Sequence, residues 1–494
     1  MNTFTQNEQK ATSPEDLAKE LIFTTDTNVF IQGRAGTGKS YFLTETIKKY
    51  LPKYNKKAVF LAPTGLAARH IGGKTIHSFI MSKNKENFDL IIIDEVSMVR
   101  ADLLDKLDAY LRKKFINIPF GGKQMIFVGD LYQLPPVVAM SEDHKSKAFE
   151  NPYPTTKQDF ETYLNGKSVQ TYDSSFFLSA NSIRQTYLEI IEFTKVYRQE
   201  EKDFLDLLNA VRTDSLSAAD FVKLNSRQIP FGSKVNSDIY LACNNAMAED
   251  YNKRRLKELV SQTGNEIYPF LAENYPQKLP SWINIQEPKL LQVAVGARVM
   301  ITKNDRNKEK AYVNGDTGTV KEIICAQNPE RYRQFCYRDT ILVELDRKDL
   351  YGNKIVVCIY PNEIEVKEEI FNGYNIEEKK HWEKTFKQFP LRLAWALTIH
   401  KSQGQTYDKI ILDLGENGAF ERGQAYVALS RCRTFKGINL VNEIGEKSIS
   451  VSHQIPRLID IQKQINKLIR AKNIQEYYAT KSPLTQSNGL CATI

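Results

Sequence analysis

The sequence predicts an α/β protein whose first domain is a doubly wound parallel sheet, and two observations favour this class. Four short apolar segments in the first third of the chain each run into a polar or glycine-rich motif, at 29–31, 58–61, 90–93 and 125–128. Between the last two segments, apolar side chains recur at helical spacing at positions 103, 104, 107, 110 and 111. Strands that alternate with helices and carry motifs at their carboxyl ends are typical of doubly wound sheets.

The first apolar segment leads into GRAGTGKS at residues 33–40, which fits the phosphate-loop pattern G-x-x-x-x-G-K-[ST]. Helical spacing follows over 41–50, so the motif has the strand–loop–helix setting it requires. Backbone N–H groups in such a loop hold nucleotide phosphates at the positive end of a helix. The alternative is a glycine-rich turn that fits by accident. We expect a nucleoside triphosphate to be bound by Gly33, Ala35, Gly36, Thr37, Gly38, Lys39 and Ser40.

In this interpretation Lys39 reaches the β- and γ-phosphates, and the Ser40 hydroxyl is a ligand of Mg²⁺. Asp94 and Glu95 follow the apolar run 90–93. Once a phosphate loop is present, one carboxylate at a strand end can hold the metal while its neighbour polarises the attacking water. We assign Asp94 to the metal and Glu95 to the base. The alternative is an acidic helix start, which the helix dipole favours.

Bulk properties restrict the protein class. The 494 residues predict two to four domains, and the formal charge of +9 permits a polyanionic partner such as nucleic acid. The six cysteines are far apart and form no C-x-x-C pair, which argues against a zinc site or a disulfide framework. Residues 1–20 are polar, and no run approaches the ~20 apolar residues of a membrane span. We expect a soluble intracellular protein with no membrane partner.

The remaining chain is organised less regularly. We expect a surface insertion at 141–173, periodic helical sequence at 186–212, strands and turns up to 320, and strand-like sequence at 318–371. Residues 351–353 suit a hairpin turn. We further expect a charged connector at 377–388, strands at 409–412 and 438–441, a helix around 458–468 that packs on the body, and a frayed tail at 480–494.

Gln133 lies in GDLYQLPPV, at the end of the strand 125–128. It could sense the γ-phosphate and report its loss through the stiff Pro-Pro segment. The alternative is a solvated glutamine in a Pro-bounded turn, which this stretch by itself favours.

A series of motifs, in order and spacing, resembles PIF-type, RecD-like DNA helicases of superfamily one. The resemblance covers about residues 28–441. The motifs are APTGLAA at 62–68, DEVSM at 94–98, GDLYQLPPV at 129–137, VYRQ at 196–199, VGARVM at 295–300, VNGD at 313–316, AWALTIHKSQGQT at 394–406 and GQAYVALSR at 423–431.

The resemblance implies two RecA-like P-loop domains with ATP between them and a small SH3-like β module inserted in the second. It implies that Arg198 and Arg431 reach from the second domain to the γ-phosphate, and that Gln403 and Gly404 lie at the cleft. It divides the chain into a first domain at 1–185, a second at 186–320 and 389–446, the β module at 321–388, and a C-terminal helix and tail at 447–494. Residues 12–16 lack the glutamine that usually reads adenine in related helicases.

By the same resemblance, single-stranded DNA runs across both α/β domains. The residues that match DNA-binding motifs are Pro63, Thr64 and His77 in the first domain and Thr398, His400, Lys401 and Ser402 in the second.

The implied activity is an ATP- and Mg²⁺-dependent DNA helicase that moves 5′→3′ in replication, repair or recombination. The implied partners are single-stranded DNA and duplex junctions. We expect a monomer in the cytoplasm or nucleoid, or in the nucleus or mitochondrion of a eukaryote. Two alternatives stay open: a nucleotide-dependent DNA-binding switch or loader that does not unwind, and a P-loop phosphotransferase such as a kinase. The motifs in the second domain argue against the phosphotransferase.

Overall fold

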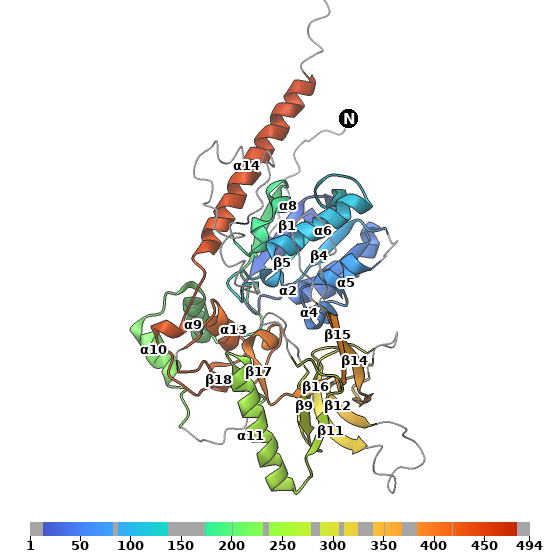
Figure 1. Cartoon of the computed structure of the whole chain (residues 1–494). Coiled ribbons are helices and arrows are strands. Elements are labelled where there is room, and N and C mark those ends of the chain that lie inside the picture. The colour runs from blue at the N-terminus through green and yellow to red at the C-terminus, as the bar shows by residue number, and fades with distance from the viewer. Residues whose placement is uncertain are drawn as a thin grey trace, which may run out of the picture.

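The computed structural model describes the chain in twelve stretches. They are 13–82, 87–136, 172, 174–199, 201–230, 237–277, 287–305, 311–324, 339–349, 351–367, 383–416 and 418–481. Two parallel sheets with their helices lie beside an antiparallel β module, and a long C-terminal helix extends from the body (Figure 1).

The first sheet is parallel throughout and, within the described residues, has six strands in the order β3-β2-β4-β5-β1-β6. The four apolar segments predicted as strands are among them, so those predictions are confirmed. The strands are β1 (Asn28–Gly33), β2 (Ala58–Ala62), β3 (Lys74–Thr75), β4 (Leu90–Ile93), β5 (Gln124–Gly129) and β6 (Leu188–Phe193).

Strand β1 shows why helices cover both faces of this sheet. Val29 and Ile31 pack into a core with helix α1 (Pro14–Thr24) and the π-helical turn η1 (Phe42–Ile47). Phe30, on the other face, packs with helix α6 (Ala101–Lys114). Because successive strand side chains point to opposite faces, one apolar strand needs two helical layers. The predicted doubly wound sheet is confirmed.

The helix expected after the phosphate loop is present as consecutive turns. They are α2 (Lys39–Tyr41), η1, α3 (Lys48–Tyr50) and the 3-10 turn η2 (Leu51–Tyr54). The other helical elements of this domain are α4 (Gly65–His70), α5 (Ile76–Met81), η3 (Val96–Met98), η4 (Pro119–Gly122), η6 (Phe177–Ser179) and α8 (Asn181–Arg184).

Residues 188–193 are a strand, not the beginning of a helix as the sequence predicts for 186–212. This strand, β6, pairs in parallel with β1 along its whole length. It extends the first sheet past residue 185, where the sequence places the end of the first domain. The predicted helix is present only over α9 (Lys202–Thr213). The apolar residues of β6 fit either period over so short a run, and only pairing with β1 decides between them.

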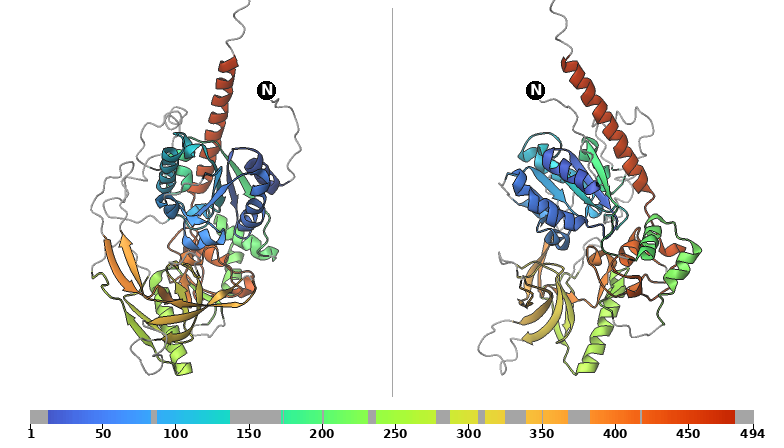
Figure 2. Two further views of the ribbon diagram at one scale, coloured as in Figure 1. Left: turned by 90° about the vertical axis from the view of Figure 1, so that its right-hand side faces the viewer. Right: turned by 180° about the vertical axis from the view of Figure 1, so that it is seen from behind.

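Helix α14 (Gln454–Lys481) covers the outer edge of β6 (Figure 2). The Asn466 side chain accepts the Leu188 N–H at 3.0 Å and donates to the Leu188 carbonyl at 2.7 Å. Ile455 and Leu458 join the core of the first domain. At this residue, the Asn466 amide makes the two backbone hydrogen bonds that a further strand would make at the edge of the described sheet. The predicted packing of this helix on the body is confirmed, and the tail from 482 onward lies outside the described residues.

The second sheet is also parallel, with the order β17-β7-β18-β19 in the part of the chain that is described. The predicted strands at 409–412 and 438–441 are confirmed. Its strands are β7 (Ile239–Ala242), β17 (Ala396–Thr398), β18 (Ile410–Asp413) and β19 (Ile438–Leu440). Its helices are α9, α10 (Ala218–Asn225), α11 (Asn245–Thr263) and α13 (Gln424–Leu429), with 3-10 turns η7 (Ile399–Ser402), η8 (Phe435–Gly437) and η9 (Glu446–Ser448).

Helix α11 lies where the sequence predicts only strands and turns. Its buried residues are Ala248, Asn252 and Leu256, so its apolar stripe is narrow. Asn252 donates to the carbonyls of Leu393 and Ala396 and accepts the Ala396 N–H. A polar side chain thus holds this helix to β17, and the hydrophobic pattern alone does not reveal it.

The β module is an antiparallel sheet of five strands among the described residues, in the order β13-β12-β11-β10-β16. Its ladder reaches from 298 to 393 and therefore exceeds the predicted 321–388. The strand-like segments around 341–345 and 355–359 and the turn at 351–353 are confirmed; resemblance to an SH3 fold stays a prediction. The strands are β10 (Arg298–Ile301), β11 (Thr317–Ile324), β12 (Thr340–Lys348), β13 (Lys354–Ile359) and β16 (Leu391–Leu393).

Two hairpins flank this sheet. One joins β8 (Tyr268–Leu271) to β9 (Leu290–Val293), and the other joins β14 (Asn362–Lys367) to β15 (Glu383–Gln388). Strand β15 corrects the expectation of a solvated connector at 377–388. Phe386 is buried against the ring of Tyr275, and one apolar side chain in a charged segment is a weak signal. Residues 377–382 and nearly all of the predicted insertion at 141–173 lie outside the described residues. Within the described chain, no helix has the length and apolar character needed to cross a membrane.

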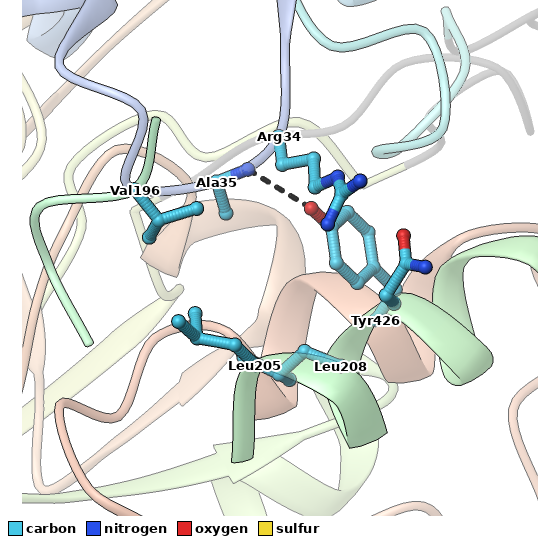
Figure 3. Close-up of a pocket in the computed structure, with 7 residues that line it drawn as sticks. Arg34, Ala35, Val196, Leu205, Leu208 and Tyr426 are labelled. Carbon is cyan, nitrogen blue, oxygen red and sulfur yellow. Dashed lines mark hydrogen bonds between the residues drawn. The ribbon is translucent and has the colours of Figure 1, made fainter. Parts of the chain in front are cut away.

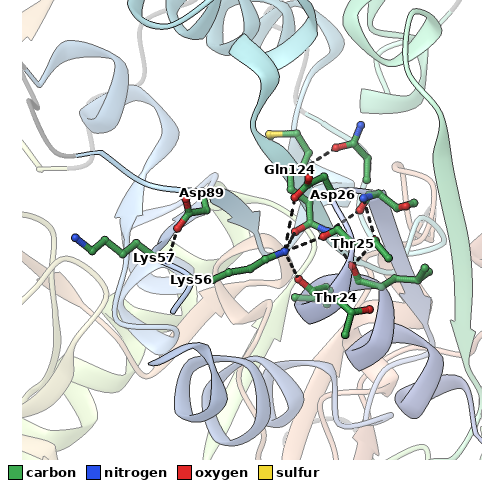
Figure 4. A network of polar contacts seen from close by, with 12 residues as sticks. Thr24, Thr25, Asp26, Lys56, Lys57, Asp89 and Gln124 are labelled. Atoms are coloured by element: carbon green, nitrogen blue, oxygen red, sulfur yellow. Dashed lines mark hydrogen bonds and ion pairs between the residues drawn. The ribbon is translucent and has the colours of Figure 1, made fainter. Parts of the chain in front are cut away.

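Lys56 ties together the end of α1 and the start of β5 beneath the first sheet (Figure 4). Its ammonium donates to the carbonyls of Ile22 and Thr25 at 2.9 and 2.7 Å and to the Gln124 side chain at 3.3 Å. Carbonyls at the end of a helix have no partner within the helix, so this lysine supplies one.

We expect Lys56→Met to lower the free energy of unfolding by about 1–3 kcal/mol, because the apolar stem stays while the carbonyls lose their donor. Urea unfolding followed by circular dichroism measures this. Lys57→Met is the matched control: its side chain is exposed, so its effect should stay within about 0.5 kcal/mol. Equal effects of the two variants would contradict the structural role of Lys56.

Candidate functional site

The candidate residues gather where parallel strands of both sheets end. Lys39 follows β1, Asp94 follows β4 and Asp130 follows β5, while the turn 398–404 follows β17. Ligands of open α/β sheets bind beyond the carboxyl ends of the strands. The two sheets present these ends to a shared junction, at which the contacts described below are made.

The phosphate loop has the backbone that its glycines allow. Gly36 and Gly38 adopt φ of +81° and +77°, a region that favours glycine. A Cβ on Gly36 would lie 2.6 Å from the Cβ of Arg198, so the loop lies directly against the second-domain segment. The Lys39 ammonium donates to the carbonyls of Gly33 and Arg34 at 2.6 and 2.8 Å. Burial lowers the pKa of Lys39, while Asp130, Glu95 and Asp94 oppose that shift.

The acidic pair is placed beside this loop. Asp94 is 5% exposed, and burial together with the charge of Glu95 raises its pKa to about 7. The Glu95 N–H donates to Asp94 Oδ1 at 2.9 Å, and Glu95 itself has φ of +50°. Glu95 Oε2 accepts from Gln403 Nε2 of the second domain at 3.1 Å. Burial and the charge of Glu95 disfavour the charged form of Asp94, so a cation bound beside it would stabilise its carboxylate.

Two arginines approach from the second domain. Arg431 is 1% exposed, and its Nε donates to the Val427 carbonyl at 2.9 Å. Arg198 Nη1 donates to the Ser430 carbonyl at 3.3 Å. Burial and then the like charge of Arg431 lower the pKa of Arg198 to about 10. A buried guanidinium and a half-buried one that repel each other form a site for an anion.

Three buried side-chain amide oxygens at the junction lack a hydrogen-bond partner within the described residues. They are the Oε1 atoms of Gln133, Gln199 and Gln403. Buried polar atoms are normally paired, so such a group of orphans fits a polar ligand. None of the described His, Cys, Asp and Glu side chains form a cluster of three or more that could hold a metal by itself. Mg²⁺ usually binds through one or two carboxylates plus substrate phosphates, and Asp94 with exposed Ser40 fits that mode.

A buried polar network at the junction has no counterpart in the predicted site. Arg212 Nη2 donates to Asp130 Oδ1 at 3.1 Å, and its guanidinium lies 4.1 Å from the centre of the Tyr132 ring. Tyr426 donates its hydroxyl to Asp130 Oδ2 at 3.0 Å and accepts the Ala35 N–H at 2.9 Å (Figure 3). Tyr426 and Asp130 lie inside quoted motifs, but Arg212 lies in none, so no sequence signal marks it.

The candidate DNA residues of the first domain lie near the β module. Thr64 Oγ1 accepts the Ala67 N–H and so begins helix α4, with Pro63 before it. His77 is exposed on α5. Arg69 at the other end of α4 pairs with Asp316 of the β module.

Those of the second domain differ in exposure. His400 Nε2 lies 2.6 Å from Glu421 Oε2. Burial and then the positive charge of Arg392 lower the pKa of Lys401 to about 8. Thr398 is 6% exposed, and Ser402 is fully buried with its hydroxyl donating to the Ile399 carbonyl at 2.7 Å. The side chains of His400 and Lys401 are therefore more accessible to a ligand than the buried side chains of Thr398 and Ser402.

Comparison with known proteins agrees with this geometry. A family model described as PIF1-like helicase matches residues 5–85 and 80–153. The ATP-dependent DNA helicase RRM3 of Saccharomyces cerevisiae is 30% identical over 89% of this chain and 67% of its own length. A crystal structure of Bacteroides Pif1 bound to ssDNA is 31% identical, with a TM-score of 0.67 over 92% of this chain and 97% of that one.

The chain belongs to the PIF1-like helicase family. The resemblance read from the motifs and the predicted fold of two parallel α/β domains are thus confirmed. The human ATP-dependent DNA helicase PIF1 is 31% identical over 84% of this chain, which spans 58% of the human protein. A structure of Bacteroides Pif1 with ADP-AlF3 and ssDNA has a TM-score of 0.67 over 93% of this chain, also at 31% identity.

We expect DNA affinity to decrease by about five- to tenfold between pH 7 and pH 9, because the Lys401 ammonium loses its proton as the pH rises through its lowered pKa. Since the pKa of Lys401 is lowered to about 8, the charged form predominates at pH 7, and its contribution to DNA affinity is largely lost by pH 9. Fluorescence anisotropy with a single-stranded oligonucleotide measures it. Lys401→Arg is the matched control, since its guanidinium stays charged and its pH profile should be flat. If the DNA affinity of Lys401→Arg decreased with pH as it does in the unaltered protein, Lys401 would be excluded as the source of the pH dependence.

Proposed function

We propose that this protein is an ATP-dependent DNA helicase that translocates on single-stranded DNA in the 5′→3′ direction. One observation carries the proposal. A phosphate loop and an acidic pair from one α/β domain meet two arginines from the other, half-buried Arg198 and buried Arg431. A site divided in this way can open and close with the nucleotide, which a site within one domain cannot.

For hydrolysis, Lys39 leaves its loop carbonyls for the β- and γ-phosphates, and the amides of 36–40 hold the phosphate oxygens. Glu95 orients the attacking water, and Gln133, whose buried Oε1 lacks a partner among the described residues, contacts the γ-phosphate. Arg198 and Arg431 stabilise the charge that develops on the transferring phosphoryl group. Ser40 and Asp94 hold Mg²⁺, which neutralises charge on the phosphate oxygens when bound.

Single-stranded DNA is proposed to cross the tops of both domains. It contacts Pro63, Thr64 and His77 in the first domain and His400 and Lys401 in the second. Thr398 and Ser402 shape the turn that carries His400 and Lys401. Solved relatives described as bound to ssDNA and as acting at forked dsDNA support this partner. Alternating grip on the phosphates during opening and closing of the junction converts hydrolysis into steps. The 5′→3′ direction rests on the family.

We propose that one chain suffices for translocation, since both halves of the site come from the same chain. One relative is described as two coordinating Pif1 helicases on forked dsDNA, so two chains on one fork are the alternative. A rate per chain that is independent of protein concentration would support the monomer.

A second candidate is a nucleotide-dependent DNA-binding switch or loader. It is favoured by the short connection between Met81 at the end of α5 and Leu90 at the start of β4. This leaves little chain for an element of the first domain that separates strands. ATP hydrolysis stimulated by DNA without strand separation would establish it.

We expect Lys39→Ala and Arg431→Ala each to lower DNA-stimulated ATP hydrolysis by about a thousandfold, since one removes the phosphate contact and the other the countercharge of the transition state. A coupled ATPase assay with saturating single-stranded DNA measures this. Arg433→Ala is the control: this arginine is two positions from Arg431 but 60% exposed, in an ion pair with Asp408, and its variant should stay within about twofold. Substantial stimulated hydrolysis in Arg431→Ala would remove that arginine from the site.

We expect duplexes with a 5′ single-stranded tail to be unwound in an ATP-dependent manner and those with a 3′ tail to stay intact. The tail loads the protein on one strand, and only movement toward the duplex separates it. A strand-displacement assay with fluorophore and quencher on the two strands reports the result, and Lys39→Ala serves as the inactive control. Unwinding confined to 3′ tails would reverse the proposed direction.

A further inference from the structure

One peptide group of the phosphate loop is held from both sides. The carbonyl of Arg34 accepts from the Lys39 ammonium at 2.8 Å, and the N–H of Ala35, in the same peptide group, donates to the Tyr426 hydroxyl at 2.9 Å (Figure 3). Lys39 belongs to the loop, whereas Tyr426 comes from helix α13 of the second domain. A single planar group therefore joins the phosphate-binding lysine to the opposite domain.

The direction of these hydrogen bonds is fixed. A backbone N–H can only donate, so the Tyr426 hydroxyl must accept from Ala35 and send its own proton elsewhere. That proton goes to Asp130 Oδ2 at 3.0 Å. Arg212 donates to the other oxygen of Asp130 at 3.1 Å, so both oxygens of this carboxylate act as acceptors. The hydroxyl thus cannot rotate without losing one of its two bonds.

The surroundings leave little room for a substitute. Ala35 is 8% exposed and packs into the same core as Leu208 and Val427 of the second domain. The cavity that Ala35 and Tyr426 help to line has a volume of about 10 Å³. That is about the space of a single water, so at most one water fits beside these groups.

Helix α13 also places an arginine of the candidate site. Arg431 Nε donates to the carbonyl of Val427, the residue that follows Tyr426. The Tyr426 hydroxyl and the Arg431 guanidinium are therefore fixed to one rigid helical turn. A displacement of this turn moves the arginine and releases the Ala35 N–H at the same time.

We propose that Tyr426 is a positioning residue that ties the shape of the phosphate loop to the placement of Arg431. It holds the Arg34–Ala35 peptide of the phosphate loop in place only while α13 is seated against the first domain. Tyr426 contacts no phosphate and is not a catalytic residue. The inference rests on the proposed ATP hydrolysis and names a residue through which the two halves of that site are aligned.

The test compares Tyr426→Phe with Tyr240→Phe. Tyr240 is 6% exposed and donates its hydroxyl to Asp413, so it is an equally buried Tyr–Asp pair that lies in the second sheet and touches no part of the loop. Both variants should lower the melting temperature by about 2–4 °C. Only Tyr426→Phe should lower kcat of DNA-stimulated ATP hydrolysis, by about tenfold, with KM for ATP changed less than about threefold. The loop amides still bind the nucleotide, while the phosphate loop and Arg431 lose their alignment with each other.

Equal effects of the two variants on kcat, whether both unchanged or both reduced, overturn the proposal. Absence of hydrolysis in the unaltered protein would instead remove the proposed function, so the two failures are distinguishable. Hydrogen exchange of the unaltered protein supplies a measurement that needs no variant. The Ala35 amide should exchange slowly without nucleotide, and exchange as fast as that of an exposed loop amide overturns the proposal even where Tyr426→Phe does not fold.

Discussion

The carboxylate of Asp130 is buried completely between the two α/β domains, and its need for partners governs how they meet. A buried charge without a partner costs far more than most proteins can offset, so the chain must bring donors to it. One donor, the Tyr132 N–H, is local, but the two side-chain donors, Arg212 and Tyr426, come from the second domain, 82 and 296 positions away in sequence. Asp130 follows β5 at the carboxyl edge of the first sheet, so the contact that satisfies it also places α9 and α13 against the phosphate loop. The junction forms around this one charge.

The same junction contains polar groups that lack stabilising partners. Their role differs from that of Asp130, which is structural. Asp130 has a cation and a hydroxyl as partners, whereas buried Asp94 has its pKa raised to about 7. Arg198 and Arg431 repel each other, and amide oxygens beside them lack partners within the described chain. Unpaired buried groups persist only where a ligand or a function compensates for their cost. The satisfied Asp130 contacts hold the domains together, whereas buried Asp94, the two like-charged arginines and the unpaired amide oxygens form a site for an anion and a cation.

Local sequence was sufficient for some of this and insufficient for the rest, for a physical reason. Four strands of the first sheet, β1, β2, β4 and β5, and the phosphate loop are encoded in short apolar runs followed by a motif, so local sequence predicts them. Strand β6 was predicted as helix because its partners, β1 and Asn466, lie far away in sequence, the latter 278 positions from Leu188. Arg212 stands in no motif, and its role follows only from the carboxylate beside it. A local sequence pattern predicts elements and motifs that form from neighbouring residues. Contacts between residues far apart in sequence become visible only in the folded structure.

The short turn after β17 links the candidate DNA surface to the acidic pair. Lys401 stands at the candidate DNA surface, and Gln403, two positions on, donates to Glu95 of the first domain at 3.1 Å. Between them the buried Ser402 hydroxyl is bonded to the Ile399 carbonyl, which closes the turn on itself and leaves it little freedom to stretch. A rigid turn transmits displacement, so a shift of Lys401 toward a phosphate changes the contact between Gln403 and Glu95. Ser402 stiffens this turn, so its buried hydroxyl has a structural role in a segment whose sequence resembles a DNA-binding motif.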